Sequence, residues 1–173
     1  GDNTARASGV IASAGGGGKI LQIVQSVKTG TSSISGGWAD ISDLSIAITP
    51  TAENSKIMLS ASVMCHKYGA MGFLKLLRDI GGAGYADSAY IGDAAGSRIQ
   101  CSHMLAGDWT ILDANFDFLD SPSYSLTDEI TYKVQGKCSN GSYPTYVNRA
   151  YYDTNSTDYG RFVSSITARE VSA

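Results

Sequence analysis

The sequence contains no long apolar run, and this absence excludes a membrane-spanning helix. Nowhere in the 173 residues do about 18 or more apolar residues follow one another, which is the length at which a helix can cross a bilayer. The opening residues GDNTARASG also lack the basic and apolar regions of a signal peptide. We therefore expect no membrane insertion. Because residue 1 is glycine and not methionine, we also expect a fragment or processed piece of a longer protein.

Charge is scarce, and basic charge in particular is not concentrated anywhere. Charged residues make up 17% of the chain, with 13 Lys and Arg against 16 Asp and Glu, for a net charge of -3. Binding to nucleic acid requires clustered Lys and Arg that displace counterions from phosphates. The basic residues here are scattered, so we expect no nucleic-acid partner.

Cysteine is also rare, and its spacing does not suggest a disulfide framework. The sequence has three cysteines, an odd number, and they are widely spaced at Cys65, Cys101 and Cys138. Each falls in a run of alternating apolar and polar residues, where a buried, reduced thiol is expected. A zinc site could be drawn from Cys65 and Cys101 with His66 and His103, but no short Cys or His clip is present. Adjacent residues of a strand also point to opposite faces. We expect no metal and no cofactor.

Glycine, serine and threonine are abundant, and they surround short stretches in which apolar and polar residues alternate. The 20 glycines favour short strands and turns over helices, and a chain of this length is expected to form one domain. Period-two alternation indicates half-buried strands. They are expected at 19–28, 38–49, 55–65, 72–79, 98–106, 116–120, 130–135, 146–151 and 161–171. Eight or nine short strands predict an all-β fold, an antiparallel β-sandwich of jelly-roll-like form.

Three of these stretches carry more specific predictions. Residues 116–137 predict a half-buried antiparallel hairpin, because two alternating runs flank the turn at 121–123. Residues 55–65 predict a central strand with one face in the core. Residues 19–28 have two apolar faces, as in an interior position or a subunit contact.

The connecting segments are expected at 29–37, 81–98 and 136–159, together with a turn at 107–108. Residues 1–18, ending in four glycines, predict an N-terminal arm or linker, and residues 19–173 the sandwich domain. A phosphate-binding loop is not expected at the glycines, because no GK[ST] tail and no helix follow.

No local motif nominates a catalytic residue. A serine nucleophile would be marked by a GxSxG elbow, which is absent. A catalytic carboxylate pair could be drawn from Asp113, Asp117 and Asp120, but such residues more commonly cap turns. We expect no enzymatic activity.

The aromatic residues in the polar loops are the feature of the sequence that says most about function. Tyrosines combined with Asn, Asp and Ser are typical of adaptable recognition surfaces, and sugar-binding sites use the same residue types. Packing of these rings on the sandwich edge or on another subunit is the alternative interpretation. The candidate contact residues are Tyr85, Tyr90, Trp109, Asn140, Tyr143, Tyr146, Tyr151, Tyr152, Asp153 and Tyr159.

A series of short blocks, in order, also resembles a known family. The blocks are GGGKILQIVQ, W-x-DISDLSIAITP, SKIMLSASV, FLKLLRD, IGDAAGSR, FLDSP, ITYKVQGK, VNRAYYD and VSSITAREV. From about Gly15 to Val171 the chain resembles the C-terminal domains of tail-fibre-type proteins of tailed bacteriophages.

The resemblance implies a distal β-sandwich of a virion tail appendage, extracellular when it acts and generally homotrimeric. Its partners would be a host cell-surface glycan or protein and, through the N-terminal side, other virion tail proteins. A structural decoration or head-fibre module that binds other virion proteins is the alternative. A polysaccharide depolymerase is a further alternative, although the linear β-helix repeat usual for such enzymes is absent.

Overall fold

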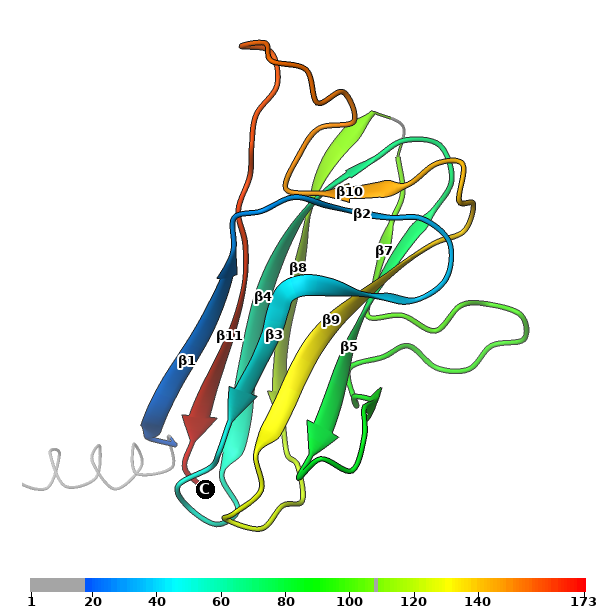
Figure 1. Cartoon of the computed structure of the whole chain (residues 1–173). Helices are drawn as coiled ribbons and strands as arrows, with labels where there is room; N and C mark the ends of the chain where they lie inside the picture. Colours follow the sequence, from blue (N-terminus) through cyan, green and yellow to red (C-terminus); the bar gives the residue numbers. More distant parts are fainter. Residues whose placement is uncertain (1–17, 108) are drawn as a thin grey trace, which may run out of the picture.

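The described part of the chain consists of strands and loops and contains no helix. No described segment is therefore a helix long and apolar enough to cross a membrane. The computed structural model describes residues 18–107 and 109–173. Residues 1–17 of the expected arm and Asp108 of the expected turn lie outside the described residues. Eleven strands form two antiparallel sheets, so the predicted all-β sandwich is confirmed (Figure 1).

The first sheet is built on the long strand β4, which pairs with other strands on both of its edges. Its four principal strands, in spatial order, are β1 (Ile20–Lys28), β11 (Ser164–Val171), β4 (Lys56–Lys67) and β8 (Thr110–Asp120). Two short strands, β10 (Thr145–Val147) and β2 (Ser32–Ile34), continue the sheet beside the last residues of β4.

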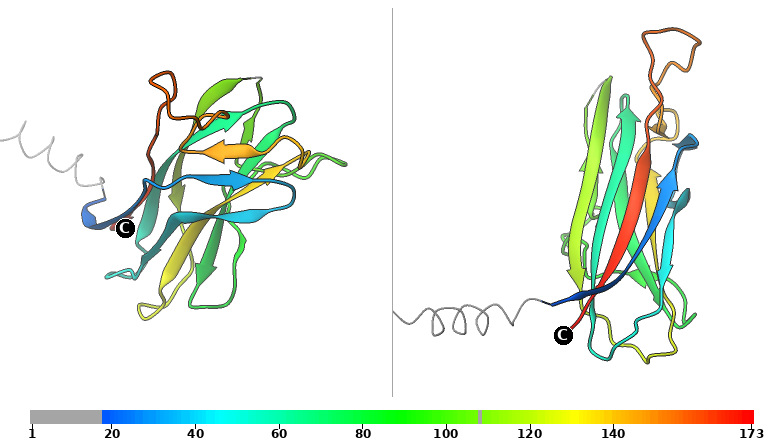
Figure 2. Two further views of the ribbon diagram at one scale, coloured as in Figure 1. Left: turned by 45° about the horizontal axis from the view of Figure 1, so that its top comes forward. Right: turned by 90° about the vertical axis from the view of Figure 1, so that its left-hand side faces the viewer.

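The second sheet packs face to face with the first (Figure 2). Its strands, in spatial order, are β3 (Ala39–Ile48), β9 (Ile130–Cys138), β5 (Gly72–Ile80) and, along the far edge of β5, β7 (His103–Leu105) and β6 (Ala86–Asp87).

The eight principal strands have jelly-roll connectivity. Without the short β2, β6 and β10, the two sheets have the orders β1-β11-β4-β8 and β3-β9-β5-β7. Consecutive strands therefore lie in opposite sheets, except for β5 and β7, which are neighbours in one sheet. Two interleaved Greek keys of this kind define a jelly roll.

This connectivity overturns the hairpin predicted at 116–137. β8 pairs with β4 in the first sheet, whereas β9 pairs with β3 and β5 in the second, so residues 121–129 cross between the sheets. Alternation reports only which side chains face the core. Two strands that face each other across the core, with Phe116 and Tyr132 both buried, show the same pattern as two strands that pair side by side.

Burial confirms the predicted central strand. The inward-facing side chains of β4 are all buried, and they form one core cluster with side chains from both sheets. Burying each large aliphatic side chain of this kind contributes about 1.5–3 kcal/mol. The inward-facing residues of β4 are Ile57, Leu59, Ala61, Val63 and Cys65.

Some strand boundaries differ from the prediction. The strand expected at 98–106 is limited to β7, the loop expected at 29–37 contains β2, and the strand expected at 146–151 occupies 145–147 as β10. Cys101, expected to be buried in a strand, lies in a loop and is half-buried, while Cys65 and Cys138 are buried as predicted. All three thiols are free.

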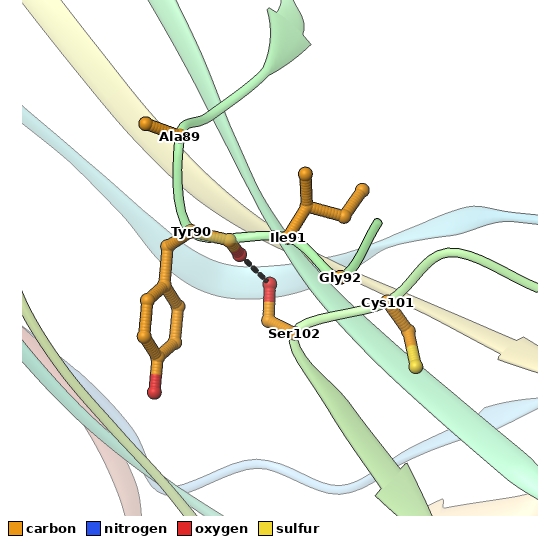
Figure 3. Close-up of a pocket in the computed structure, with 6 residues that line it drawn as sticks. All are labelled: Ala89, Tyr90, Ile91, Gly92, Cys101 and Ser102. Carbon is orange, nitrogen blue, oxygen red and sulfur yellow. Dashed lines mark hydrogen bonds between the residues drawn. The ribbon is translucent and has the colours of Figure 1, made fainter. Parts of the chain in front are cut away.

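Residues 98–102 are held by loop contacts instead of a strand ladder. Figure 3 shows the hydroxyl of Ser102 donating to the carbonyl oxygen of Tyr90, and the amide of Gly92 donates to Cys101 O at 3.1 Å. These bonds tie the 81–102 segment to itself beside β5. A shallow hollow of about 280 Å³ lies between the two arms of the segment.

β1 lies at a sheet edge, which excludes the interior position, one of the two alternatives expected for 19–28, and leaves the subunit contact as a prediction. Among the described residues it pairs with β11 alone, and its outward residues Leu21, Ile23 and Val27 are exposed. The strand thus presents an apolar face that nothing in the described part of the chain covers.

Asp120, one of the carboxylates weighed for catalysis, joins the two sheets in a buried ion pair. Arg78 Nη1 donates to both carboxylate oxygens at 2.7 Å, and the Tyr132 hydroxyl donates to Oδ2 at 2.8 Å. Burial, and then the adjacent carboxylate, raises the pKa of Tyr132 above its ordinary value, so the phenol remains a donor. Asp113 and Asp117 lie on the exposed side of β8.

Glu170 is a second buried carboxylate, and it anchors the β3–β4 turn. It accepts hydrogen bonds from the amides of Thr51 and Ala52 and from the side chain of Gln22. Burial alone would raise the pKa of Glu170, but hydrogen bonds from Gln22 and Thr51 outweigh it and lower the pKa. The carboxylate therefore stabilises the fold at neutral pH, and the stabilisation is lost only in the acid range.

The ends of the described chain lie at one end of the sandwich. The amide of Ser172 donates to Lys19 O at 2.9 Å. The start of β1 and the C-terminus lie at the bottom of the view in Figure 1, whereas the 148–163 loop and β10 lie at the top.

Candidate functional site

The end of the sandwich opposite the ends of the described chain carries a continuous cluster of aromatic rings. Ring-to-ring contacts connect all of them, with centroid distances of 4.4–6.5 Å. We call this set the aromatic cluster. Its members are His66, Tyr68, Trp109, Tyr143, Tyr146, Tyr151, Tyr152 and Tyr159.

Strand register explains why the rings meet. Lys67 of β4 pairs with Thr110 of β8, so the next residues outward, Tyr68 and Trp109, come together with centroids 4.4 Å apart. On the other edge of β4, His66 pairs with Tyr146 of β10. The 148–163 loop then brings further tyrosines from above.

Tyr151 lies at the centre of the aromatic cluster. Its ring is half-buried and contacts five others, mostly edge-to-face or tilted. Such pairs contribute about 0.5–1.5 kcal/mol each beyond their buried area. The centroid distances from Tyr151 are 4.9 Å to Tyr152, 5.1 Å to Tyr68, 5.2 Å to Trp109, 5.6 Å to Tyr146 and 6.3 Å to His66.

Four rings of the aromatic cluster are exposed, namely Tyr143 at 38% and three that contact one another in series. Trp109, Tyr152 and Tyr159 are 50%, 49% and 39% exposed. Trp109 and Tyr152 stack with an interplanar angle of 22°, and Tyr159 follows at 6.3 Å from Tyr152. The backbone of Trp109 has φ 58°, a left-handed conformation that costs a bulky residue about 1–3 kcal/mol and is concentrated at functional sites.

Gly69 is required beneath the cluster. Its φ is +69°, and a Cβ at this position would lie 2.7 Å from Cδ1 of Tyr143. Only glycine combines this backbone conformation with so close an approach of the Tyr143 ring.

A buried lysine supports the cluster from below. Lys67 is fully buried, and its ammonium group donates to the carbonyl oxygens of Tyr68 and Tyr143 and lies 3.4 Å from Cys138 Sγ. Within residues 18–107 and 109–173 it has no ion pair. The lysine therefore ties the β4–β5 and β9–β10 connections together under the rings.

Asn148 anchors the 148–163 loop, which carries three of the rings. Its buried side chain donates to Lys28 O at 2.7 Å and accepts from the Ser164 hydroxyl at 2.6 Å. Beyond it, the loop is closed by a bridge between Arg149 and Arg161. Asp153 lies 2.7 Å from the guanidinium of Arg161 and 3.5 Å from that of Arg149.

His66 is the titratable member of the cluster. It is buried beneath Trp109 and Tyr151, and its Nδ1 has no partner among the described residues. Burial lowers the pKa of His66, and the positive charges of Arg149 and Lys67 lower it further. The imidazole is therefore neutral at physiological pH.

We expect acidification to loosen the fold through His66. As pH falls through about 6.5, the unfolded chain binds a proton on this residue before the folded one does. The free energy of unfolding then decreases, by about 1.4 kcal/mol for each pH unit that separates the folded and unfolded pKa values. Chemical denaturation at pH 7.5 and 5.5 measures the loss.

The control variants for this measurement are His66→Phe and His103→Phe. The first removes the titration at nearly constant ring volume and should abolish the pH dependence between 7.5 and 5.5, while the second should preserve it. Glu170 does not interfere, because its lowered pKa places its effect at lower pH. Equal pH dependence in both variants would contradict the assignment to His66.

The structure brings most of the predicted contact residues together. Trp109, Tyr143, Tyr146, Tyr151, Tyr152 and Tyr159 all belong to the aromatic cluster. Asp153 lies beside them through its ion pair with Arg149, whose guanidinium stacks 4.0 Å from the ring of Tyr146.

Three predicted residues lie elsewhere. Tyr85 covers the ammonium of Lys133 on the outer side of the second sheet, 3.7 Å from ring centroid to Nζ. Tyr90 stacks on Phe118 at 5.2 Å beside the core. The side-chain oxygen of Asn140 accepts from the Ser142 amide within a turn.

Sequence reasoning missed Tyr68 and His66 as members of the site. Both follow the strongest predicted strand, and continuing that strand to residue 67 would have placed them at its end. Within the described residues, no group of three or more His, Cys, Asp or Glu side chains could hold a metal ion.

No protein-family model matches the chain, and no curated protein matches it. Chains of solved structures do match, one of them from the structure of infectious bursal disease virus, Gx strain. It shares 12% sequence identity with a TM-score of 0.39, and the match covers 89% of this chain and 38% of the viral one. At this TM-score the likeness supports no conclusion about function.

Proposed function

We propose that the protein is the distal domain of a phage tail fibre or spike that binds a host cell-surface glycan or protein without catalysis. The aromatic cluster carries this proposal. Exposed Trp and Tyr rings, rimmed by Arg149, Asp153 and Arg161, combine large contact area with few rotatable bonds, which is the composition of binding hot spots. An exposed aromatic patch on a soluble domain marks an interaction site.

The position of the cluster supports the same proposal. Both ends of the described chain lie at the opposite end of the sandwich (Figure 1). A fibre or other virion tail protein joined through the N-terminal side would hold the aromatic cluster outward. Loops on a rigid sandwich commonly carry binding residues in this way. The domain would act outside the cell, as part of the virion.

Adhesion to bacterial cells tests the proposal. The fluorescently labelled protein is incubated with a panel of bacterial strains, and bound fluorescence is compared with that of the Trp109→Ala variant. We expect saturable binding to a subset of strains. Binding to no strain, together with binding to purified virion proteins, would favour the structural decoration module instead.

We further propose that the domain assembles as a homotrimer through the outer side of the first sheet. In one row across this side, Ile23 is followed by Arg169, Met58 and Leu119, and the three apolar members are exposed. Near the start of β11, Val163 lines a hollow of about 460 Å³. Burying this surface against copies of the chain would remove an apolar patch from water.

Charge introduced on β1 is expected to dissociate this assembly. Ile23→Asp with Val27→Asp removes two apolar anchors, each contributing about 1.5–3 kcal/mol, and should shift the molar mass measured by light scattering from three chains to one. Ser45→Asp with Ala47→Asp, exposed on β3 of the other sheet, should leave the mass unchanged. A single-chain mass for the unaltered protein would contradict the proposal.

A further inference from the structure

The 148–163 loop encloses a small polar hollow next to the aromatic cluster. Its volume is about 260 Å³, and Asp153, Asn155, Ser156, Tyr159 and Arg161 line it. Tyr159 belongs both to the lining of the hollow and, through the contact of its ring with Tyr152, to the aromatic cluster. A ligand in the hollow would therefore continue directly onto the exposed rings.

The Arg and Asp charges in and beside the hollow balance one another. The Asp153 carboxylate lies 2.7 Å from the Arg161 guanidinium and 3.5 Å from that of Arg149, and Asp158 is a fourth charge nearby, hydrogen-bonded to the Ser156 hydroxyl at 3.1 Å. The two Arg and two Asp sum to zero formal charge. A carboxylated or phosphorylated ligand would meet no unpaired cation here, so the hollow favours a neutral ligand.

The polar groups suit vicinal hydroxyl groups. A carboxylate and a guanidinium held side by side offer an acceptor and a donor to two adjacent hydroxyls. The amide of Asn155, on an exposed side chain, adds a donor and an acceptor. The Tyr159 ring supplies an apolar face against which CH groups can pack. Hydroxyl groups and CH faces on one small ligand are the chemistry of a sugar ring.

We propose that this hollow is a subsite for one neutral pyranose residue, and that the next residues of the same glycan lie over Tyr152 and Trp109. The proposal rests on the receptor-binding function above and names its ligand class. The Asp153–Arg161 pair and Asn155 hold the hydroxyls, and Tyr159 holds the CH face of the sugar. Binding of one ring is weak, and the stacked pair extends the contact area.

Nuclear magnetic resonance titration of the intact protein tests the subsite. The probes are the methyl α-pyranosides of glucose, galactose and mannose, with N-acetylneuraminic acid and glucuronic acid as charged comparisons. At least one neutral glycoside should shift the amide signals of residues 153–161 at millimolar concentration. Asn155→Ala should weaken that binding about tenfold, as expected for one lost hydrogen bond to a ligand, and Asp153→Asn should weaken it more.

Asn115→Ala is the matched control, because Asn115 is exposed on β8 and should not affect sugar binding. The subsite is wrong if no neutral glycoside shifts these signals, if only the acidic sugars do, or if Asn155→Ala and Asn115→Ala behave alike.

Cell adhesion separates this proposal from the function on which it rests. If Trp109→Ala abolishes adhesion while Asn155→Ala and the glycosides leave it unchanged, the receptor function is supported and the subsite is rejected. If the sugars shift the amide signals but the protein adheres to no strain, the subsite is supported and the receptor function is rejected.

Discussion

Replacing Asp120 with alanine is expected to lower the free energy of unfolding by about 3 kcal/mol. Removing one partner of a buried ion pair typically costs about 3–5 kcal/mol, because the remaining charge loses its compensation. The lower end applies here, since the Arg78 side chain is 24% exposed and water can reach it, whereas that of Asp120 is only 3% exposed. The Tyr132 hydroxyl also loses its acceptor within the core. Chemical denaturation measures the change.

Two further variants control this prediction. Asp117→Ala removes a carboxylate from the exposed side of the same strand and should change stability by no more than about 0.5 kcal/mol. Tyr132→Phe keeps the buried ring and removes one hydrogen bond to Asp120, at a cost of about 1–2 kcal/mol. Equal effects of Asp117→Ala and Asp120→Ala would show that the ion pair does not stabilise the fold.

Replacing Trp109 with alanine is expected to weaken receptor binding at least about 30-fold, which corresponds to the 2 kcal/mol that defines a binding hot spot. Trp109 is the largest exposed ring of the aromatic cluster, and it also positions Tyr152 by stacking. The variant therefore removes one contact surface and frees a second. Dissociation constants from the cell-binding assay at a series of protein concentrations measure the effect.

The matched control for Trp109 is Tyr85→Ala, because Tyr85 is 41% exposed on the outer side of the second sheet. This variant should bind cells as the unaltered protein does. Trp109→Phe retains an aromatic face and should recover part of the affinity. A thermal unfolding midpoint is measured for each variant, so that loss of binding is not confused with loss of fold. Unchanged binding by Trp109→Ala would exclude the aromatic cluster as the receptor surface.

The aromatic cluster shows which of its members alternation and composition reveal. The loop tyrosines were predicted because five of them fall within seventeen residues of polar sequence, from Tyr143 to Tyr159. Tyr68 was missed because it is a single aromatic residue after a strand. Only the pairing of Lys67 with Thr110 shows that it meets Trp109.

Tyr90 illustrates the opposite case. Its surroundings, rich in Gly, Asp and Ser, resemble those of the loop tyrosines, yet its ring packs on Phe116 and Phe118. Composition does not distinguish a loop that projects into solvent from one that folds back over the core, because both satisfy their backbone groups with turns.

What the sequence by itself determined is the set of longer strands and the faces that they bury; the short β2 and β6 lie in segments expected to be loops. Period-two alternation arises within each strand, so β4 and its inward side chains follow from the order of residues alone. Tertiary structure alone decided which strands are neighbours. The crossing of 121–129 from one sheet to the other, the edge position of β1 and the meeting of Tyr68 with Trp109 all depend on contacts between residues far apart in the chain. Alternation carries no information about such contacts, because a side chain directed into the core is buried equally well by any partner of suitable size.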